Sequence, residues 1–123
     1  MSFTINGIGV SGGIAIGRAH LLIHTQLEVA HYDIPEREIE QEKRRFDKAI
    51  KTARTELAAL SEHIPENAPA EFEGFLNLHL MILEDSTLSE GPKALIEAQR
   101  CNAEWALTQQ AETLLDQFER IED

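Results

Sequence analysis

The residues of this chain that could support chemistry are its histidines, its single cysteine and a glycine-rich stretch near the N-terminus. Gly7, Gly9 and Gly12 follow the G-x-G-x-x-G spacing of dinucleotide-binding loops. Such a loop requires a core strand before it and a helix that opens on its last glycine. The segment before Gly7 is too short for a core strand, and residues 13–22 have a β-like pattern. Tight turns between short strands therefore explain the glycines better than nucleotide binding does.

The histidines and the cysteine are the candidate metal ligands and nucleophiles. No two histidines stand four residues apart on a predicted helix, and Cys101 has no second cysteine near it. Zinc sites built from His and Cys normally require such closely spaced ligands. We therefore predict neither a metal site nor a catalytic residue in this chain. The histidines are His20, His24, His31, His63 and His79.

His79 differs from the other histidines because it lies among the most apolar residues of the chain. A buried histidine whose ring is hydrogen-bonded by a neighbour is the simplest interpretation. The second interpretation is a histidine that faces a partner, where it donates a hydrogen bond or responds to an incoming negative charge. Phosphorylation of His79 itself is disfavoured, since neither glycine-rich nor basic residues surround it.

Length and charge limit the class of protein and the kind of partner. With 123 residues the chain is one domain or a piece of one. Its formal net charge of −11 disfavours nucleic acid and membrane surfaces as partners, because both bind basic patches, and favours a basic protein. A lone cysteine forms no internal disulfide, and the sequence shows neither a targeting peptide nor a membrane span. We therefore expect a cytoplasmic location.

The sequence changes character near Tyr32. Residues 1–31 contain five of the seven glycines, set among β-branched residues, and are predicted as a short glycine-rich β segment. From residue 32 the pattern is helical, beginning with one apolar seam that follows Pro35 for about 26 residues. Further helices are expected near 70–83, 86–100 (with a kink at Gly91-Pro92) and from an Asn102 cap onward. The predicted fold class is mainly α, with two helical hairpins forming a four-helix bundle-like domain.

The helix expected near 70–83 has more apolar surface than a bundle position requires. At about 100° per residue its apolar residues span an arc of roughly 200°, about twice the usual stripe of a surface helix. Such a helix either lies centrally in its own domain or presents a second face to a partner. The residues of this arc are Phe72, Phe75, Leu76, Leu78, His79, Leu80, Ile82 and Leu83.

Three segments resemble, in order and spacing, the N-terminal domain of the Enzyme I family. These proteins are the phosphoenolpyruvate-protein phosphotransferases of the bacterial sugar phosphotransferase system. The segments are GIGVSGGIAIGRAHLL, HLMILEDSTL and NAEWAL, and the resemblance covers nearly the whole chain. The Leu-Glu-Asp turn followed by Asn-Ala-Glu-Trp-Ala is more specific than the glycine-rich opening.

The resemblance implies a function and a division of the chain. Enzyme I takes a phosphoryl group from phosphoenolpyruvate onto a histidine and passes it to the small phosphocarrier HPr. In the family, an α/β subdomain bears that histidine and an inserted helical subdomain docks HPr. Residues 1–31 would then belong to an incomplete phosphohistidine subdomain. Residues 32–123 would be the helical HPr-binding subdomain, truncated at its C-terminal end.

The resemblance also implies that this chain alone is inactive, although its parent is an enzyme. The chain stops at Asp123, before the Gly-Gly-x-Thr-Ser-His segment that supplies the phosphorylated histidine. In the full-length family a C-terminal domain binds phosphoenolpyruvate, Mg²⁺ and the second subunit of a homodimer. We therefore expect no cofactor in this chain.

Carried over residue by residue, the HPr-binding surface of the family falls on Glu71, Phe75, His79, Met81, Ile82, Thr87, Leu88 and Phe118. An acidic rim that includes Glu84 and Asp85 would attract a carrier whose phosphohistidine has basic groups around it. Phe72 and Thr87 depart from the pattern of many relatives. The choice between the sugar carrier and the nitrogen-related carrier therefore stays open.

Two expectations remain open at this stage. The first is the alternative function of a structural helical bundle or dimerisation domain, in which the second helix pairs with its own copy. Carrier docking instead predicts a monomeric chain. The second concerns the N-terminal strands, whose family partners are missing, so that we expect this segment to be disordered or to pair with itself or a neighbouring copy.

Overall fold

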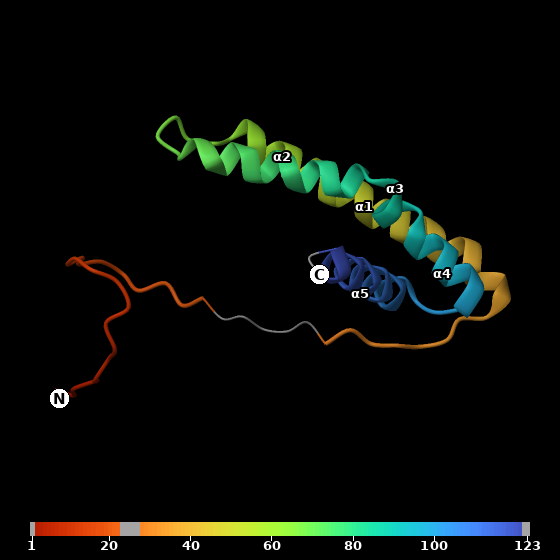
Figure 1. The fold of residues 1–123 in the computed structure, drawn as a ribbon, viewed down its shortest axis with the longest axis horizontal. Coiled ribbons are helices and arrows are strands. Elements are labelled where there is room, and N and C mark those ends of the chain that lie inside the picture. The colour runs from red at the N-terminus through yellow and green to blue at the C-terminus, as the bar shows by residue number, and fades with distance from the viewer. Residues whose placement is uncertain (1, 23–27, 122–123) are drawn as a thin grey trace.

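The computed structural model describes residues 2–22 and 28–121, and its regular structure is helical (Figure 1). The chain forms a 3₁₀ turn, η1 (Glu36–Glu38), followed by five α-helices, and the described residues contain no β-strand. The mainly α class is therefore confirmed, whereas the β segment is not observed. The α-helices are α1 (Ile39–Glu62), α2 (Ala70–Glu84), α3 (Ser86–Ser89), α4 (Gly91–Gln99) and α5 (Ala103–Ile121).

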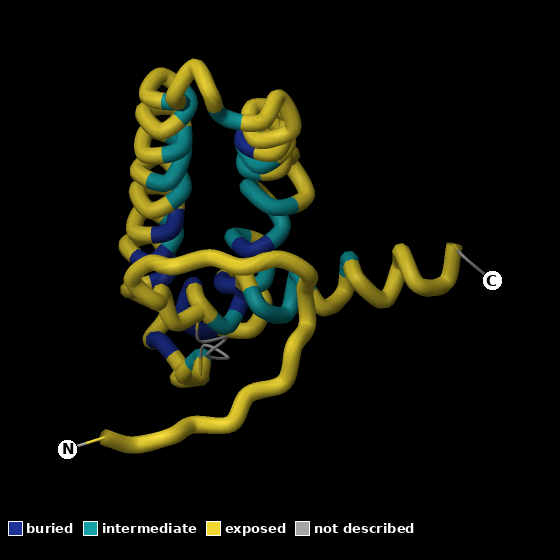
Figure 2. The backbone as a smooth tube through the Cα atoms, turned by 90° about the vertical axis from the view of Figure 1, so that its left-hand side faces the viewer, coloured by how far each residue is buried: buried dark blue, intermediate teal, exposed yellow. Residues whose placement is uncertain are grey.

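The helices pack as two pairs: α1 and α2 are antiparallel, whereas α5 packs on α4 and runs in a different direction from it (Figures 1 and 2). In Figure 1, α2, α3 and α4 follow one another along α1, so that α2 packs on one half of α1 and α4 on the other. The helix expected over residues 86–100 is two helices. The predicted interruption at Gly91-Pro92 is its cause, because Pro92 has no N–H and therefore suits the first turn of a new helix.

The N-terminal β prediction is wrong for residues 2–22 and 28–31. Residues 2–22 take part in none of the described backbone hydrogen bonds, and apolar side chains such as Ile14 and Ile16 are fully exposed. A strand needs a neighbouring strand to satisfy its backbone, and the rest of the described chain offers helices. The expected pairing of this segment with itself is likewise not observed. The other residues of that prediction, 1 and 23–27, lie outside the described part.

A short connection joins the segment before η1 to the start of α5. Asp33 and Cys101 form an isolated antiparallel bridge, and the Ile34 N–H donates to the Arg100 carbonyl at 2.8 Å. Asn102 immediately precedes α5, as predicted, yet its side chain does not cap that helix. Instead its Oδ1 accepts from the Tyr32 N–H at 3.1 Å and its Nδ2 donates to the Ala30 carbonyl at 2.9 Å.

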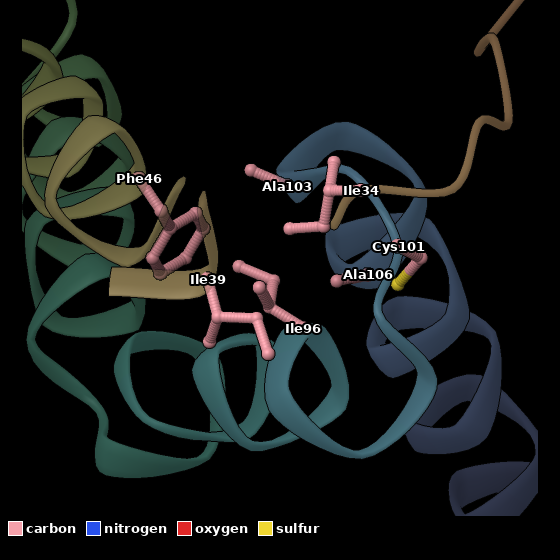
Figure 3. Packing of buried hydrophobic residues seen from close by; sticks show 7 residues of the cluster. All are labelled: Ile34, Ile39, Phe46, Ile96, Cys101, Ala103 and Ala106. Carbon is pink, nitrogen blue, oxygen red and sulfur yellow. The ribbon is translucent and has the colours of Figure 1, made fainter. Parts of the chain in front are cut away.

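The hydrophobic core lies at one end of the helical body, where α1, α4 and the first turn of α5 meet (Figure 3). Ile96 and Ala106 have no exposed surface, and Phe46 contacts them from α1. Figure 2 shows most buried positions gathered at this end, whereas the far half of α5 is largely exposed. The core residues are Ile34, Ile39, Phe46, Ile96, Cys101, Ala103 and Ala106.

A charged cluster next to this core ties α1 to the start of α5. The Glu42 carboxylate accepts the first amide of α5, that of Ala103, at 2.8 Å, and therefore caps a helix distant in sequence. Arg45 donates to Glu42 at 2.6 and 3.1 Å and to both oxygens of Glu104 at 2.7 Å. The hydrogen bond from Arg45 lowers the pKa of Glu104 to about 2 and also lowers the pKa of Glu42. We call Glu42, Arg45 and Glu104 the clamp.

Truncation of the most buried core side chain should destabilise the fold strongly. Ile96→Ala removes side-chain volume from a fully enclosed site, so unfolding in urea should show a loss of about 2 to 5 kcal/mol. Leu115→Ala on the exposed side of α5 is the control and should change stability by no more than about 0.5 kcal/mol. Equal losses for the two variants would mean that the core lies elsewhere.

The contribution of Glu104 to stability should depend on pH. Its pKa in the folded chain is about 2, below its ordinary value of 4.5, so the stabilisation is present above 4.5 and disappears as the pH falls through about 2. Glu104→Gln should therefore be less stable than the parent chain at neutral pH. This difference in thermal unfolding should shrink in acid, and a difference that stays constant down to about 2 would contradict the assignment.

Candidate functional site

The α2 helix uses one apolar face to pack and leaves a second apolar face uncovered. Leu76 is buried, and Leu80 and Leu83 are half-buried, on the face that packs against α1. Met81 on the other face has 67% of its surface exposed. The surplus of apolar surface predicted for this helix is therefore present in the structure. Its exposed residues are Phe72, Phe75, Leu78, Met81 and Ile82.

This uncovered face forms one wall of a groove of about 370 Å³. The far half of α5 supplies the opposite wall, and the turn into α3 closes one end. Five of the eight residues predicted for partner binding meet here: Met81, Ile82, Thr87, Leu88 and Phe118. The lining is completed by Leu78, Asp85 and Leu114.

The turn between α2 and α3 is held by Asp85. Asp85 caps the following helix, because its carboxylate accepts the Thr87 N–H at 2.7 Å. Hydrogen bonding from Thr87 lowers the pKa of this carboxyl group, which therefore stays ionised. The cap fixes Thr87 and Leu88 at the end of the groove and places one negative charge there.

Phe75, His79 and Glu71 lie farther along α2 and do not line the groove. The rings of Phe75 and His79 are in contact, with their centroids 4.2 Å apart. His79 Nδ1 lies 2.8 Å from the Phe75 carbonyl oxygen, which can only accept, so Nδ1 carries the proton and Nε2 is the acceptor of the neutral ring. The ring of His79 is thus hydrogen-bonded within its own helix, but His79 is half-buried and not fully buried. Glu71 is exposed.

The sequence of α2, α3 and their connections is acidic. From Ala70 to Glu90 the sequence has no lysine or arginine, while its acidic residues are Glu71, Glu73, Glu84, Asp85 and Glu90. Within the same stretch, His79 is the remaining titratable base. An apolar strip with an acidic border is therefore what α2 and α3 present.

The other histidines are dispersed over the described structure. His31 stacks on Trp105 with a centroid distance of 4.5 Å, and His63 Nδ1 lies 2.7 Å from the Ala59 carbonyl oxygen. His20 lies in the exposed N-terminal segment, and His24 is outside the described residues. Residues 2–22 and 28–121 contain no group of three or more His, Cys, Asp or Glu side chains suited to a metal ion. Mg²⁺ therefore has no fitting donor set in this part of the chain.

None of the described helices combines the length and the apolar character that crossing a bilayer requires.

Sequence reasoning missed two groove residues, Leu78 and Leu114. Leu78 belongs to the predicted apolar arc of α2, and Leu114 belongs to the regular apolar spacing of α5. The periodicity therefore marked both as apolar positions. Only the return of α5 toward α2 shows that they line the same groove.

Loss of the Asp85 cap should loosen one end of the groove. Asp85→Ala removes the acceptor for the Thr87 amide, so hydrogen exchange of that amide, measured by NMR, should become faster. Asp85→Asn is the matched control, since its side-chain oxygen can still accept this hydrogen bond. Slow exchange of Thr87 in both variants would contradict the capping role.

Comparison with known proteins assigns the chain to a family of phosphotransfer enzymes. Residues 6–123 match the family described as PEP-utilising enzyme, N-terminal. A phosphoenolpyruvate-protein phosphotransferase of Cupriavidus necator is 49% identical over 123 residues, which are 100% of this chain and 21% of that protein. No solved structure matches the chain.

Two less similar relatives are also named phosphoenolpyruvate-protein phosphotransferase. The protein of Bacillus sp. (strain S) is 32% identical over 98% of this chain and 20% of its own length. The protein of Chlamydia trachomatis is 34% identical over 86% of this chain and 19% of its own length. The chain thus spans about a fifth of the length of these relatives. With the family match covering nearly all of its residues, the chain belongs to the N-terminal family of PEP-utilising enzymes.

Proposed function

We propose that this chain is the docking module of an Enzyme I, a phosphoenolpyruvate-protein phosphotransferase, and that it binds the phosphocarrier HPr for phosphoryl transfer in sugar uptake. The observation that carries the proposal is the groove between α2 and α5, in which five residues expected to contact the carrier lie together. Family membership supports a phosphotransfer role for the parent protein.

The apolar character of the groove suits a carrier that must bind and leave. Met81, Ile82 and Phe118 expose apolar surface at the groove, and Leu88 is half-buried at its end. Transient complexes use patches of modest size, whereas permanent assemblies bury much larger apolar areas. A groove of about 370 Å³ has room for a few side chains from a partner helix or loop.

The charges around the groove specify a basic partner. The stretch from Ala70 to Glu90 has five acidic residues and no lysine or arginine. Such a one-sign surface speeds encounter with an oppositely charged protein and repels acidic ones. The groove supplies contact area, and its acidic border supplies selectivity.

Farther along α2, Phe75, His79 and Glu71 extend the proposed contact surface. The Nδ1 contact fixes the orientation of the His79 ring, so that Nε2 is the atom left for a partner's donor group. Phe75 would add apolar contact beside it and Glu71 a charge-assisted hydrogen bond. The eight proposed binding residues would thus form one surface running from Glu71 to the groove.

The proposal also covers the rest of the protein. Residues 1–31 are assigned to the phosphohistidine subdomain and residues 32–123 to the HPr-binding subdomain. The phosphorylated histidine and the sites for phosphoenolpyruvate and Mg²⁺ are assigned to other parts of a cytoplasmic, homodimeric parent enzyme. This chain alone would then bind the carrier without transferring phosphate.

A structural dimerisation domain is the second candidate function, because the same exposed face of α2 could pair with its copy. Sedimentation of the free chain at micromolar concentration separates the two candidates. A monomer agrees with carrier docking, and a tight dimer that buries α2 would favour the structural role.

Loss of an apolar side chain from the proposed contact surface should weaken carrier binding. Phe118→Ala and Phe75→Ala should each raise the Kd for HPr, measured by titration calorimetry, by an amount equivalent to about 1 to 3 kcal/mol. Leu88→Asp should have a similar effect, because it places a charge in the apolar lining. Leu115→Ala is the matched control: Leu115 and Phe118 lie on the same helix with 62% and 65% of their surface exposed, and Phe118 alone lines the groove.

NMR titration with HPr identifies the surface directly. Amide signals of residues 71–88 should shift, while signals of the glycine-rich N-terminus should stay in place. Shifts confined to that N-terminal segment, or equal losses of affinity in Phe118→Ala and Leu115→Ala, would refute the proposed docking site.

A further inference from the structure

The groove lies between the two helix pairs, so its width depends on the angle between them. Its α2 wall belongs to the α1–α2 pair and its α5 wall to the α4–α5 pair. The two pairs meet where α1 packs on α4 and on α5, and α3 packs on α4 and α5 as well. The distance between Phe118 and Met81 therefore depends on how α5 is held against these helices, and its contact with α1 is one of the constraints.

We propose that Arg45 is a positioning residue which, through Glu42 and Glu104, holds α5 at the angle that sets the width of the α2–α5 groove. This inference deepens the proposed function, since carrier binding is what the groove width would control. The effect of Arg45 on the direction of α5 does not depend on the carrier and can be measured in the free chain.

The hydrogen bonds of the clamp restrict both the position and the direction of α5. Glu42 accepts the amide of Ala103, which holds the helix end against α1. The guanidinium of Arg45 donates through Nη1 and Nη2 to the two oxygens of Glu104, a paired geometry that restricts rotation better than a single bond does. Because Ala103 and Glu104 are the first two residues of α5, these contacts act at the root of the helix.

Apolar packing does not replace the clamp on this side of the core. A second hollow of about 280 Å³ separates α1 from α5 immediately beside Arg45 and Glu104. Its walls are the α1 residues Phe46, Ala49, Ile50 and Ala53 together with Leu83, Ala103 and Leu107. Since side chains do not fill this space, the clamp is the contact that joins α5 to α1 beside the hollow, while α4 and α3 support other sides of α5. Loss of the clamp therefore gives α5 room to tilt toward the hollow.

The length of α5 amplifies a small tilt at its root. Phe118 lies fifteen residues beyond Ala103, which is about 22 Å along the helix axis, so a rotation of about 10° moves Phe118 by about 4 Å. The width of a side-chain groove is of the same order. Most residues of the far half of α5 are exposed, so few buried contacts resist such a movement.

The charges of the clamp are balanced by the helix that it holds. Two carboxylates and one guanidinium leave one net negative charge, and this charge lies at the N-terminus of α5, where the helix dipole is positive. The pKa values of Glu42 and Glu104 are both lowered, so both stay ionised at neutral pH. The clamp therefore remains fully charged at the pH at which the carrier would bind.

Arg45→Met tests the proposal, because it removes the guanidinium and keeps a long side chain over the hollow. Residual dipolar couplings of the amides of α1 and α5 in the 123-residue chain report the angle between these helices. We expect a change of about 10° or more in that angle, and a rise in the Kd for HPr of roughly fivefold or more. Glu104→Gln weakens the same contact more gently and should shift the angle in the same direction.

Lys43→Met is the matched control. Lys43 pairs with Glu97 of α4 and with Glu40, so its loss breaks a contact between the helix pairs without touching α5. The angle of α5 should then stay as in the parent chain. An unchanged angle in both Arg45→Met and Glu104→Gln would overturn the proposal, and so would an equal change in Lys43→Met.

The carrier measurements are interpreted separately from the angle. If α5 turns and the Kd for HPr stays constant, the link between groove width and docking is refuted. If HPr fails to bind even the parent chain, the proposed function is refuted, while the angle in the variants still decides the role of Arg45.

Discussion

Burial of Ile96 where α1, α4 and the start of α5 meet is the constraint on which the rest of the structure depends. Among the described residues the main core lies at this end, and α1 and α2 extend from it as an antiparallel pair. A closed bundle would have covered the second face of α2. Because the core lies at one end of the helices, apolar side chains of α2 and α5 stay exposed along the groove.

The groove and its surroundings would contribute two kinds of interaction to the proposed carrier binding. Apolar side chains from α2, α3 and α5 offer contact area, and carboxylates along α2 and α3 give the region a single sign of charge. The first contribution is short-ranged and depends on the relative position of the helices. The second acts at a distance and is weakened by salt. A docking module for a basic carrier needs both, and neither requires a catalytic group in this chain.

Helix periodicity predicted most of this architecture, and contacts between distant residues explain what it could not predict. The seam of α1, the two faces of α2 and the interruption at Pro92 are local patterns, and the structure contains them. The β segment failed because its pattern describes a strand without specifying a partner strand. Asn102 was placed correctly before α5, but its side chain bonds to residues some seventy positions away. Nothing local distinguishes Arg45 from the other cations of α1, since its partner Glu104 lies on another helix.

The stretch of sequence without lysine or arginine is longer than the part that lines the groove. From Thr55 to Pro92 the sequence contains no lysine or arginine, which includes all of α2 and α3. Trypsin therefore has no cleavage point there and releases the region as one long peptide, whatever its exposure. Reagents and enzymes that acylate lysine amines likewise find no target on it.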